Sequence, residues 1–298
     1  MKRNSSYLFA LVAILLWSTA GTAFKLALKG MDFIQLLVIS SNVAWLVLFG
    51  FIIAKGQFKQ LVGQKPGDLL RSAVNGLINP FLFYVVLLKA YSLLPAQIAQ
   101  PLNYTWPVML VLLSVPFLHQ KLRLIDLGAI LISFSGVLII SSQGSNPFKT
   151  PVNEPFGIIL AIGSSILWAS FWIINVRDKR PEIIKIALNF FFGSLFADLA
   201  LIFFSGLPDF TIALLPAAYV GLTEMAIAFV CWQIALEKSD HNAGISNMVF
   251  IAPFIALFLI HIILGEKIYW TTPAGLVFIV GGILLQQLTR RNENIPTP

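Results

Sequence analysis

Residues 106–136 read WPVMLVLLSVPFLHQKLRLIDLGAILISFSG, and residues 252–282 read APFIALFLIHIILGEKIYWTTPAGLVFIVGG. Each stretch opens beside a proline, runs through an apolar segment to a lysine, and continues in a second apolar segment that ends on glycine. Pro107, Lys121 and Gly136 each recur 146 positions later in the chain. The two halves of the chain therefore repeat one unit, and that unit is built from long apolar segments.

The composition places these segments in a membrane. Of the 298 residues, 58% are hydrophobic and 11% are charged, whereas a soluble protein carries about 25% charged residues. The apolar segments have about the 20 residues that a spanning helix needs. We predict an all-α membrane protein with ten spans: 8–28, 33–54, 73–93, 98–118, 124–142, 157–176, 184–205, 213–236, 244–264 and 269–288.

The basic residues predict the orientation of the spans. Threading ten spans from a cytoplasmic N-terminus puts 15 of the 20 Lys and Arg residues inside, as the positive-inside rule requires. The five outside are Lys25, Lys29, Lys89, Lys149 and Lys267. We therefore expect a multi-pass inner-membrane protein with both termini in the cytoplasm. The net charge of +7 fits loops between spans better than it fits a nucleic-acid partner.

Five spans per half is an odd number, so the second half should be inverted relative to the first. We predict two repeats, residues 1–145 and 146–290, followed by a disordered cytoplasmic tail at 291–298. The first segment also resembles a cleavable signal peptide. Its apolar character continues past Ala20 and it has a counterpart in the second half, which favours a retained span.

Three motifs carry a family resemblance: AILLWST at 13–19, the stretch from Ala252 to Lys267, and GGIL at 281–284. In this order they resemble the drug/metabolite transporter superfamily, of the ten-span type with two EamA repeats. His119-Gln120-Lys121 departs from that pattern, because the family usually has Gly-Glu-Lys there. The stretch NYTWP at 103–107 is similar to the fourth-span motif of bacterial aromatic amino acid exporters.

The resemblance implies a secondary transporter that moves a small metabolite by alternating access around a central cavity. Export of an amino acid or an aromatic compound is the implied direction and substrate class. Inverted repeats are a common basis for such transport. We expect no cofactor and no metal, and the chain has no GxxxxGK[ST] motif for ATP.

Glu224 is the first candidate for substrate chemistry. It lies in the middle of the eighth apolar segment, where burying a carboxylate costs a few kcal/mol. It can bind a cationic or amine group, or carry a coupling proton. The residue 145 positions earlier is Asn79. Polar groups at equivalent positions of both halves predict two walls of one cavity. The alternative is an acid satisfied by a neighbouring helix.

Other candidates are amide and aromatic side chains inside the spans. Asn103 and Asn247 lie in segments with helix-breaking Pro or Gly, where carbonyl groups become free to bind a ligand. We expect the cavity walls to include five aromatic residues: Trp17, Tyr104, Trp106, Trp168 and Trp172. Helix packing and lipid contact are the alternative roles for all of them.

Three further positions complete the predictions. Asp198 and His261 lie inside apolar segments and are candidates for proton coupling. The alternative for Asp198 is extension of its carboxylate to the interface, and the alternative for His261 is a hydrogen bond to a neighbouring helix. Lys25 and Lys89 lie near span ends, where we expect their ammonium groups to extend to the interface.

Other protein classes remain as alternatives. An intramembrane enzyme needs a nucleophile and base, or a metal cluster, and the spans show neither motif. A lipid-handling protein of the same fold is the second alternative, and a channel is the third, although no filter-like sequence is present. We expect a small-molecule substrate and membrane lipid as partners, and no nucleic acid. A homodimer is compatible with the sequence.

Overall fold

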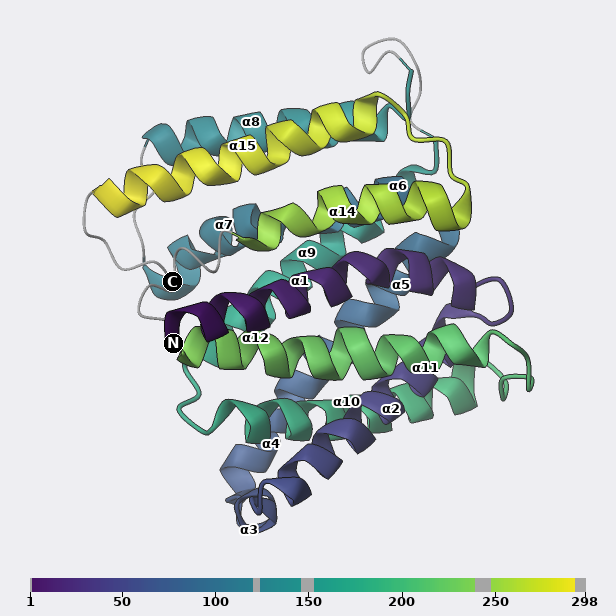
Figure 1. The fold of residues 1–298 in the computed structure, drawn as a ribbon, viewed down its shortest axis with the longest axis vertical. Helices are drawn as coiled ribbons and strands as arrows, with labels where there is room; N and C mark the ends of the chain where they lie inside the picture. The colour runs from purple at the N-terminus through teal and green to yellow at the C-terminus, as the bar shows by residue number, and fades with distance from the viewer. Residues whose placement is uncertain (1, 120–123, 146–152, 239–247, 293–298) are drawn as a thin grey trace.

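The computed structural model describes residues 2–119, 124–145, 153–238 and 248–292, and every regular element within them is a helix (Figure 1). Short π and 3-10 segments are labelled η. The first half contains α1 (Lys2–Ala27), α2 (Phe33–Ala54), α3 (Phe58–Val62), α4 (Pro66–Gly76), η1 (Leu77–Leu82), α5 (Phe83–Leu93), α6 (Ala96–Asn103), α7 (Trp106–Leu118) and α8 (Leu124–Ser141). The second half contains α9 (Pro155–Val176), α10 (Glu182–Phe204), α11 (Leu214–Leu222), η2 (Thr223–Ile227), α12 (Ala228–Glu237), η3 (Val249–Ile251), α14 (Ala252–Leu259), η4 (Ile260–Leu264) and α15 (Thr271–Asn292).

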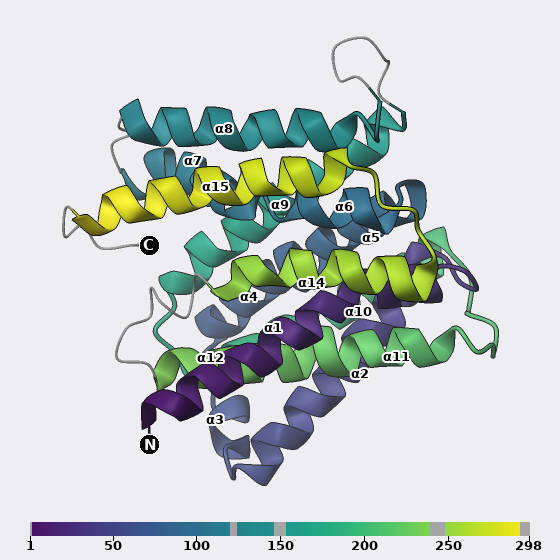
Figure 2. The ribbon, with the colours of Figure 1, turned by 45° about the horizontal axis from the view of Figure 1, so that its top comes forward.

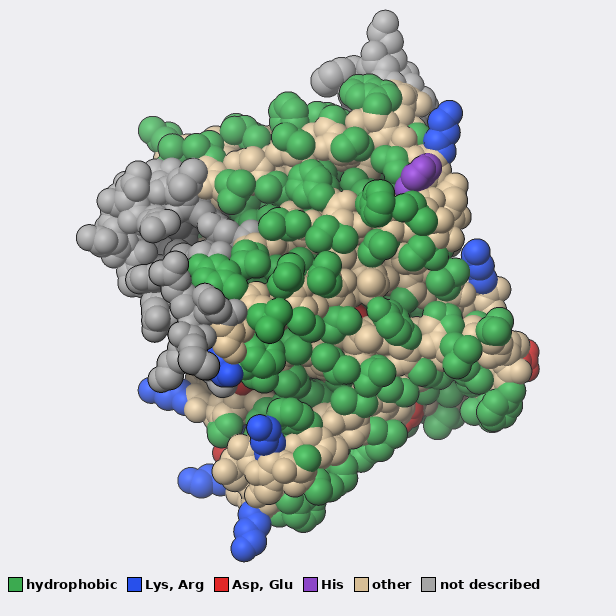
Figure 3. Space-filling model, viewed as in Figure 1, with side chains coloured by type: hydrophobic (Ala, Val, Ile, Leu, Met, Phe, Trp, Pro, Cys, Tyr) green, Lys and Arg blue, Asp and Glu red, His purple; other side chains and the backbone are tan. Residues whose placement is uncertain are grey.

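The length and composition of the helices identify a multi-pass membrane protein. Among the described residues, 8 helical segments are long and apolar enough to cross a bilayer. Two shorter apolar helices, Val249–Leu264 and Thr271–Leu285, fall where the ninth and tenth spans are predicted. Hydrophobic side chains cover most of the face seen in Figure 3, and Lys and Arg lie toward its margins.

Local sequence signals explain where several helices begin and end. Asp32 caps α2, because its carboxylate accepts the backbone N–H groups of Ile34 and Gln35 at 2.7 and 3.0 Å. The fourth and ninth spans both end on a left-handed residue, His119 with φ 53° and Gly265 with φ 69°. These residues are 146 positions apart, so the two halves keep one backbone turn despite the mismatched sequences. Glycine adopts that conformation without the Cβ penalty that histidine carries.

The helices form two bundles, and each bundle mixes helices from both halves. In the first bundle, α1 packs against α11, α12 and α14, and α2 packs against α11. In the second bundle, α9 packs against α5, α6 and α7, and α10 packs against α4. The repeat relates the two sets of contacts helix by helix. The bundles meet where α2 lies along α10 and where α1 touches α5 and α6.

The last helices of the two halves, α8 and α15, lie side by side at one edge of the two bundles (Figures 1 and 2). Glycine permits this approach. A Cβ atom on Gly136 would lie 2.4 Å from the carbonyl oxygen of Gly275, and one on Gly275 would lie 2.5 Å from that of Gly136. The reciprocal contact joins equivalent helices by small residues, as membrane helix pairs commonly do.

Candidate functional site

The third and eighth spans both depart from regular α-helix at their midpoints, 145 residues apart. In the third span, Asn79 has an extended backbone, with φ −143° and ψ 119°, inside η1. Pro80 explains the break, because a proline disfavours helical geometry in the residue before it and has no N–H to donate. In the eighth span the π segment η2 contains Glu224. The two predicted cavity-wall residues therefore occupy matching irregularities.

Glu224 has one satisfied and one unsatisfied carboxylate oxygen. The hydroxyl of Tyr84, on α5 just beyond the first break, donates to Oε1 at 3.2 Å. Oε2 is buried and has no hydrogen-bond partner among the described residues. The residue as a whole keeps partial exposure, whereas Tyr84 is fully buried. A buried polar oxygen without a partner is costly, so Oε2 is suited to accept a hydrogen bond from a ligand or to take a proton.

The buried amide Asn79 also lacks a partner for one atom, Oδ1. Two further amides at the contact between α4 and α10, Asn75 and Asn189, have both side-chain polar atoms buried and unpaired. The helices approach closely there, since a Cβ atom on Gly76 would lie 2.5 Å from the carbonyl oxygen of Asn189. Unsatisfied polar atoms thus gather along the broken third span.

An aromatic cluster connects the two bundles beside these breaks. Phe229 on α12 lies between two tryptophans, with ring centroids 6.0 Å from Trp17 and 5.7 Å from Trp168. Trp168 also contacts Phe83 at 4.8 Å and Trp172 at 6.1 Å. The structure therefore brings together three of the predicted aromatic residues. Phe83 and Phe229 were not predicted, although Phe229 is the counterpart of Tyr84 at the repeat spacing of 145.

Asn103, Tyr104 and Trp106 lie where α6 and α7 meet α9. Asn103 donates to the hydroxyl of Ser164 at 2.8 Å, so this amide ties α6 to α9. Tyr104 and Trp106 are half-buried at the break between α6 and α7. Trp172 has a buried Nε1 without a partner among the described residues. Asn247 lies outside the described residues.

The two other proton-coupling candidates have partners of their own. Asp198 accepts a hydrogen bond from Asn42 at 2.9 Å, which joins α10 to α2. His261 is exposed, and its Nδ1 lies 2.9 Å from the carbonyl oxygen of Glu266 near the end of the ninth span. Among the described residues, neither side chain is hydrogen-bonded to Glu224. Among the described residues no group of three or more His, Cys, Asp and Glu side chains could hold a metal ion.

A set of cross-bundle hydrogen bonds closes one end of the molecule. We call it the latch, and its side chains are Lys25, Gln97 and Glu266. Lys25 on α1 donates to the carbonyl oxygens of Tyr91 and Leu94 at 2.9 and 3.0 Å, at the end of α5. The prediction for Lys25 was extension to the interface, but the exposed carbonyl groups at a helix C-terminus offer its ammonium a closer partner.

Glu266 makes the second part of the latch. Its carboxylate accepts the backbone N–H groups of Ala96 and Gln97 at 2.9 and 3.2 Å, in the first turn of α6. A carboxylate at a helix N-terminus satisfies orphan donors and opposes the positive end of the helix dipole. Glu266 follows α14, so this contact joins the first bundle to the second.

Gln97 completes the latch from the second bundle. Its Nε2 donates to the carbonyl oxygen of Lys267 at 2.9 Å, and its Oε1 accepts from the backbone of Tyr269 at 2.8 Å and the hydroxyl of Thr272 at 3.2 Å. Close packing continues one helical turn further along α6, at Gln100. A Cβ atom on Gly21 would lie 2.2 Å from Oε1 of Gln100.

The opposite end, which we call the basic end, carries a buried charge network within the second bundle. Arg180 forms an ion pair with Asp178 at 2.6 Å and donates to the hydroxyl of Ser72 at 2.9 Å. Lys185 is 1% exposed, and its ammonium pairs with Glu182. Burial alone would raise the pKa of the Asp178 carboxyl, but the hydrogen bonds and charge of Arg180 hold the pKa below its ordinary value.

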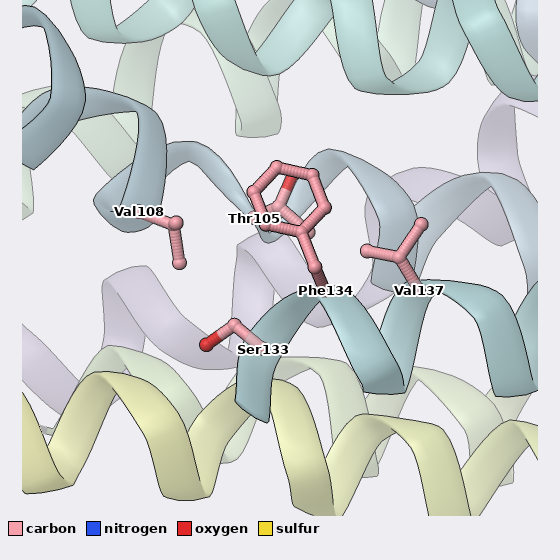
Figure 4. Close-up of a pocket in the computed structure, with 5 residues that line it drawn as sticks. All are labelled: Thr105, Val108, Ser133, Phe134 and Val137. Carbon is pink, nitrogen blue, oxygen red and sulfur yellow. The ribbon is translucent and has the colours of Figure 1, made fainter. Parts of the chain in front are cut away.

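Two hollows differ in size and place. The smaller one, between α7 and α8, is lined by Thr105, Val108, Ser133, Phe134 and Val137 and is too narrow for a water molecule (Figure 4). The larger one is a cleft of about 290 Å³ at the basic end. Its walls come from α2 and α12 of the first bundle and from α10 of the second. The bundles are thus joined at the latch and separated by a cleft at the basic end.

Comparisons with known proteins agree with this architecture. The sequence model of the EamA-like transporter family matches residues 4–142 and 155–286, once in each half. An uncharacterized transporter of Clostridium kluyveri is 28% identical over 306 residues, covering 98% of this chain and 96% of the relative. The aromatic amino acid exporter YddG of Ancylobacter novellus is 23% identical over 297 residues, covering 98% and 100%. A crystal structure 20% identical in sequence has a TM-score of 0.69 over 98% of this chain and 100% of its own, which supports the fold.

Proposed function

Because the chain belongs to the EamA-like transporter family, we propose that it is a secondary transporter exporting a small metabolite across the inner membrane by alternating access. Its substrate site lies around Glu224 at the paired helix breaks. The observation that carries the proposal is the unpartnered Oε2 of Glu224, buried between two bundles beside Tyr84. The names of the relatives point to transport and not to an enzyme.

The proposed topology has ten spans in two inverted repeats of five. The 8 long apolar helices and the two shorter ones supply the spans. The helix-by-helix correspondence between the two bundles supports inversion, because each bundle draws equivalent helices from opposite halves. The excess of basic residues supports a cytoplasmic location for the basic end and both termini, and in that orientation the latch faces outward.

In this orientation the structure corresponds to an inward-facing state. Lys25, Gln97 and Glu266 hold the bundles together on the outside. On the inside, the bundles part at the cleft between α2, α10 and α12. Transport requires the reverse arrangement, in which the latch opens and the cleft closes. The charge network around Asp178 lies within one bundle, so rocking of the bundles leaves it intact.

The proposed substrate carries an amine and an apolar or aromatic part. Glu224 supplies an acceptor for an ammonium group, and Asn79 supplies an unpaired amide oxygen across the repeat. Trp17, Trp168 and Phe229 supply flat apolar walls that suit aromatic and cationic groups. The exporter of aromatic amino acids among the relatives fits this class of substrate.

The test is transport by the purified protein in proteoliposomes. Labelled L-phenylalanine, L-leucine and phenethylamine are offered to the parent protein and to Glu224→Gln at pH 5.5 to 8.5. We expect the substitution to lower flux by about tenfold or more and to flatten its pH dependence, because one charge-assisted contact is worth about 1.5–3 kcal/mol. Equal flux from parent and variant at every pH would remove Glu224 from the mechanism.

Asp198→Asn is the matched control, since it neutralises another acid inside a span. We expect it to retain flux, because Asn42 already supplies a partner for Asp198 within the helix contact. Loss of pH dependence in this variant alone would move proton coupling to Asp198. Movement of fluorescent phospholipid, with none of the three solutes carried, would favour the lipid-handling alternative.

A further inference from the structure

The cleft at the basic end contains polar groups that the proposed transport site does not use. It opens between α2 and α12 on one side and the start of α10 on the other. Its volume of about 290 Å³ is just below the range of small-molecule sites, about 300–1,000 Å³. A site of this size holds a small molecule, and both bundles would contact it.

Two groups in the cleft lack partners. The ammonium of Lys55 lies 5.5 Å from the ring centroid of Phe51 and makes no hydrogen bond or ion pair to any described residue. Oε1 of Gln57 is buried and has no hydrogen-bond partner among the described residues. The cleft thus offers one cation and one buried acceptor. A matching ligand has an anionic group and an N–H donor.

The acid in the cleft does not supply the missing partner for Lys55. Glu182 pairs through Oε1 with the buried Lys185 and through Oε2 with the amide of Asn175 at 3.4 Å. Helix α10 begins at this residue, and the preceding Pro181 offers no side-chain cap. Helix N-termini attract anions through their orphan N–H groups. Lys55 and the start of α10 therefore favour an anion at the same mouth.

Apart from Gln233, the remaining wall is apolar. Ile183 and Ile186 of α10 face Val230 and Ile234 of α12 across the cleft. Burying an apolar side chain against such a wall stabilises binding through the hydrophobic effect. The cleft combines this wall with a cation and an acceptor at its mouth, which is the pattern of an apolar α-amino acid.

We propose that the cleft is a loading site where an apolar or aromatic amino acid binds from the cytoplasm before it reaches Glu224. Its carboxylate contacts Lys55 and the start of α10, its ammonium donates to Gln57, and its side chain lies against Ile186 and Ile234. This inference rests on the proposed function for its direction and substrate class. Walls from both bundles favour a transported solute over a resident lipid, because cleft closure would expel the occupant.

The test measures cleft occupancy separately from transport. Ile234→Cys, in a Cys231→Ser background, places a maleimide-reactive reporter in the cleft, and Val230→Cys is a second reporter. We expect L-phenylalanine to slow alkylation of either reporter severalfold, and phenylalaninamide, which lacks the carboxylate, to protect weakly. Lys55→Met should raise the L-phenylalanine concentration for half-protection by about three- to fivefold, because Lys55 is exposed. Lys59→Met removes an exposed lysine outside the cleft and should leave that concentration unchanged.

The outcomes separate the loading site from the transport proposal. Transport of L-phenylalanine without protection of either reporter would overturn the loading site alone. Protection that depends on Lys55 in a protein that carries no solute would support the site and overturn the transport proposal. Protection unchanged by Lys55→Met, or seen only in nanodiscs that contain phosphatidylethanolamine, would overturn the loading site in favour of nonspecific or lipid occupancy. Absence of both protection and transport would overturn both.

Discussion

Glu266→Gln should loosen the latch without unfolding the protein. The carboxylate of Glu266 accepts two backbone N–H groups of α6, at 2.9 and 3.2 Å. Glutamine keeps one acceptor oxygen, so the variant loses one charge-assisted hydrogen bond and the favourable interaction with the helix dipole. Together these are worth about 2–3 kcal/mol when buried, and Glu266 is only partly buried. We expect a loss of about 1.4 kcal/mol, which is a tenfold rise in the minor, unlatched population.

Thiol alkylation from the outside measures that population. Thr22→Cys in a Cys231→Ser background places a thiol on α1 behind the latch, at a position that is 4% exposed. Cysteine is close to threonine in size, so the reporter itself should disturb packing little. A membrane-impermeant maleimide should react about tenfold faster when Glu266 is glutamine, because the reactive state is the minor, unlatched one.

Asp209→Asn is the matched control. Asp209 is an exposed acid at the same end of the molecule, between α10 and α11. It should leave the alkylation rate unchanged. Equal rates for the parent and Glu266→Gln, in proteins with the same unfolding temperature, would refute the assignment of Glu266 as a latch residue.

Two further predictions concern stability. Gly275→Ala should destabilise the protein by about 2 kcal/mol, because its Cβ would meet the Gly136 carbonyl oxygen at 2.5 Å. Gly281→Ala on the same helix should be neutral, because a Cβ there meets nothing within 4 Å. Thermal unfolding in detergent compares the two variants, and equal effects would contradict the packing argument. The depressed pKa of Asp178 contributes stability that is complete above its unfolded value of about 4 and is lost as pH falls through the folded value. Asp178→Asn should therefore lower the unfolding temperature at pH 7 and flatten its decline between pH 5 and pH 3, and an unchanged decline would contradict the role of the ion pair.

The repeat in the sequence predicted much of the fold. The spacing of 145 pairs Asn79 with Glu224, and both residues lie in irregular helix. Pro80 gives a local reason for the first break, whereas η2 contains no proline and has only Gly221 shortly before it. The π segment there was predictable only from the correspondence between halves. The same correspondence predicts that Phe229 lies near the site, because Phe229 is the counterpart of Tyr84 at a spacing of 145.

The latch was not predictable from motifs. Lys25 and Glu266 bind backbone groups of α5 and α6, which carry no distinctive side chains at those points. Gln97 has no special sequence context, and its partners lie beyond the ninth span. These contacts follow from how the bundles exchange helices between halves. A sequence pattern predicts which helices are equivalent, but the contacts between unlike helices depend on their packing.

The charge pattern of the loops likewise does not predict the contacts of individual basic residues. Lys185 is counted by the charge pattern as a cytoplasmic basic residue, yet it is 1% exposed and pairs with Glu182. Its ammonium also donates to the carbonyl oxygen of Asp178 at 2.9 Å. Charge counts predict which end a residue occupies. They do not distinguish a solvated lysine from one that holds a connection between two helices.

Rocking of the two bundles is the central claim, and paired distances between spin labels test it most directly. In a Cys231→Ser background, Lys29→Cys with Ser92→Cys reports across the latch end, and Lys179→Cys with Lys238→Cys reports across the basic end. All four positions are exposed. We predict that an outward-facing population, enriched by Glu266→Gln, lengthens the first distance and shortens the second. Two distances that stay constant while the labelled proteins transport substrate would contradict alternating access by these bundles.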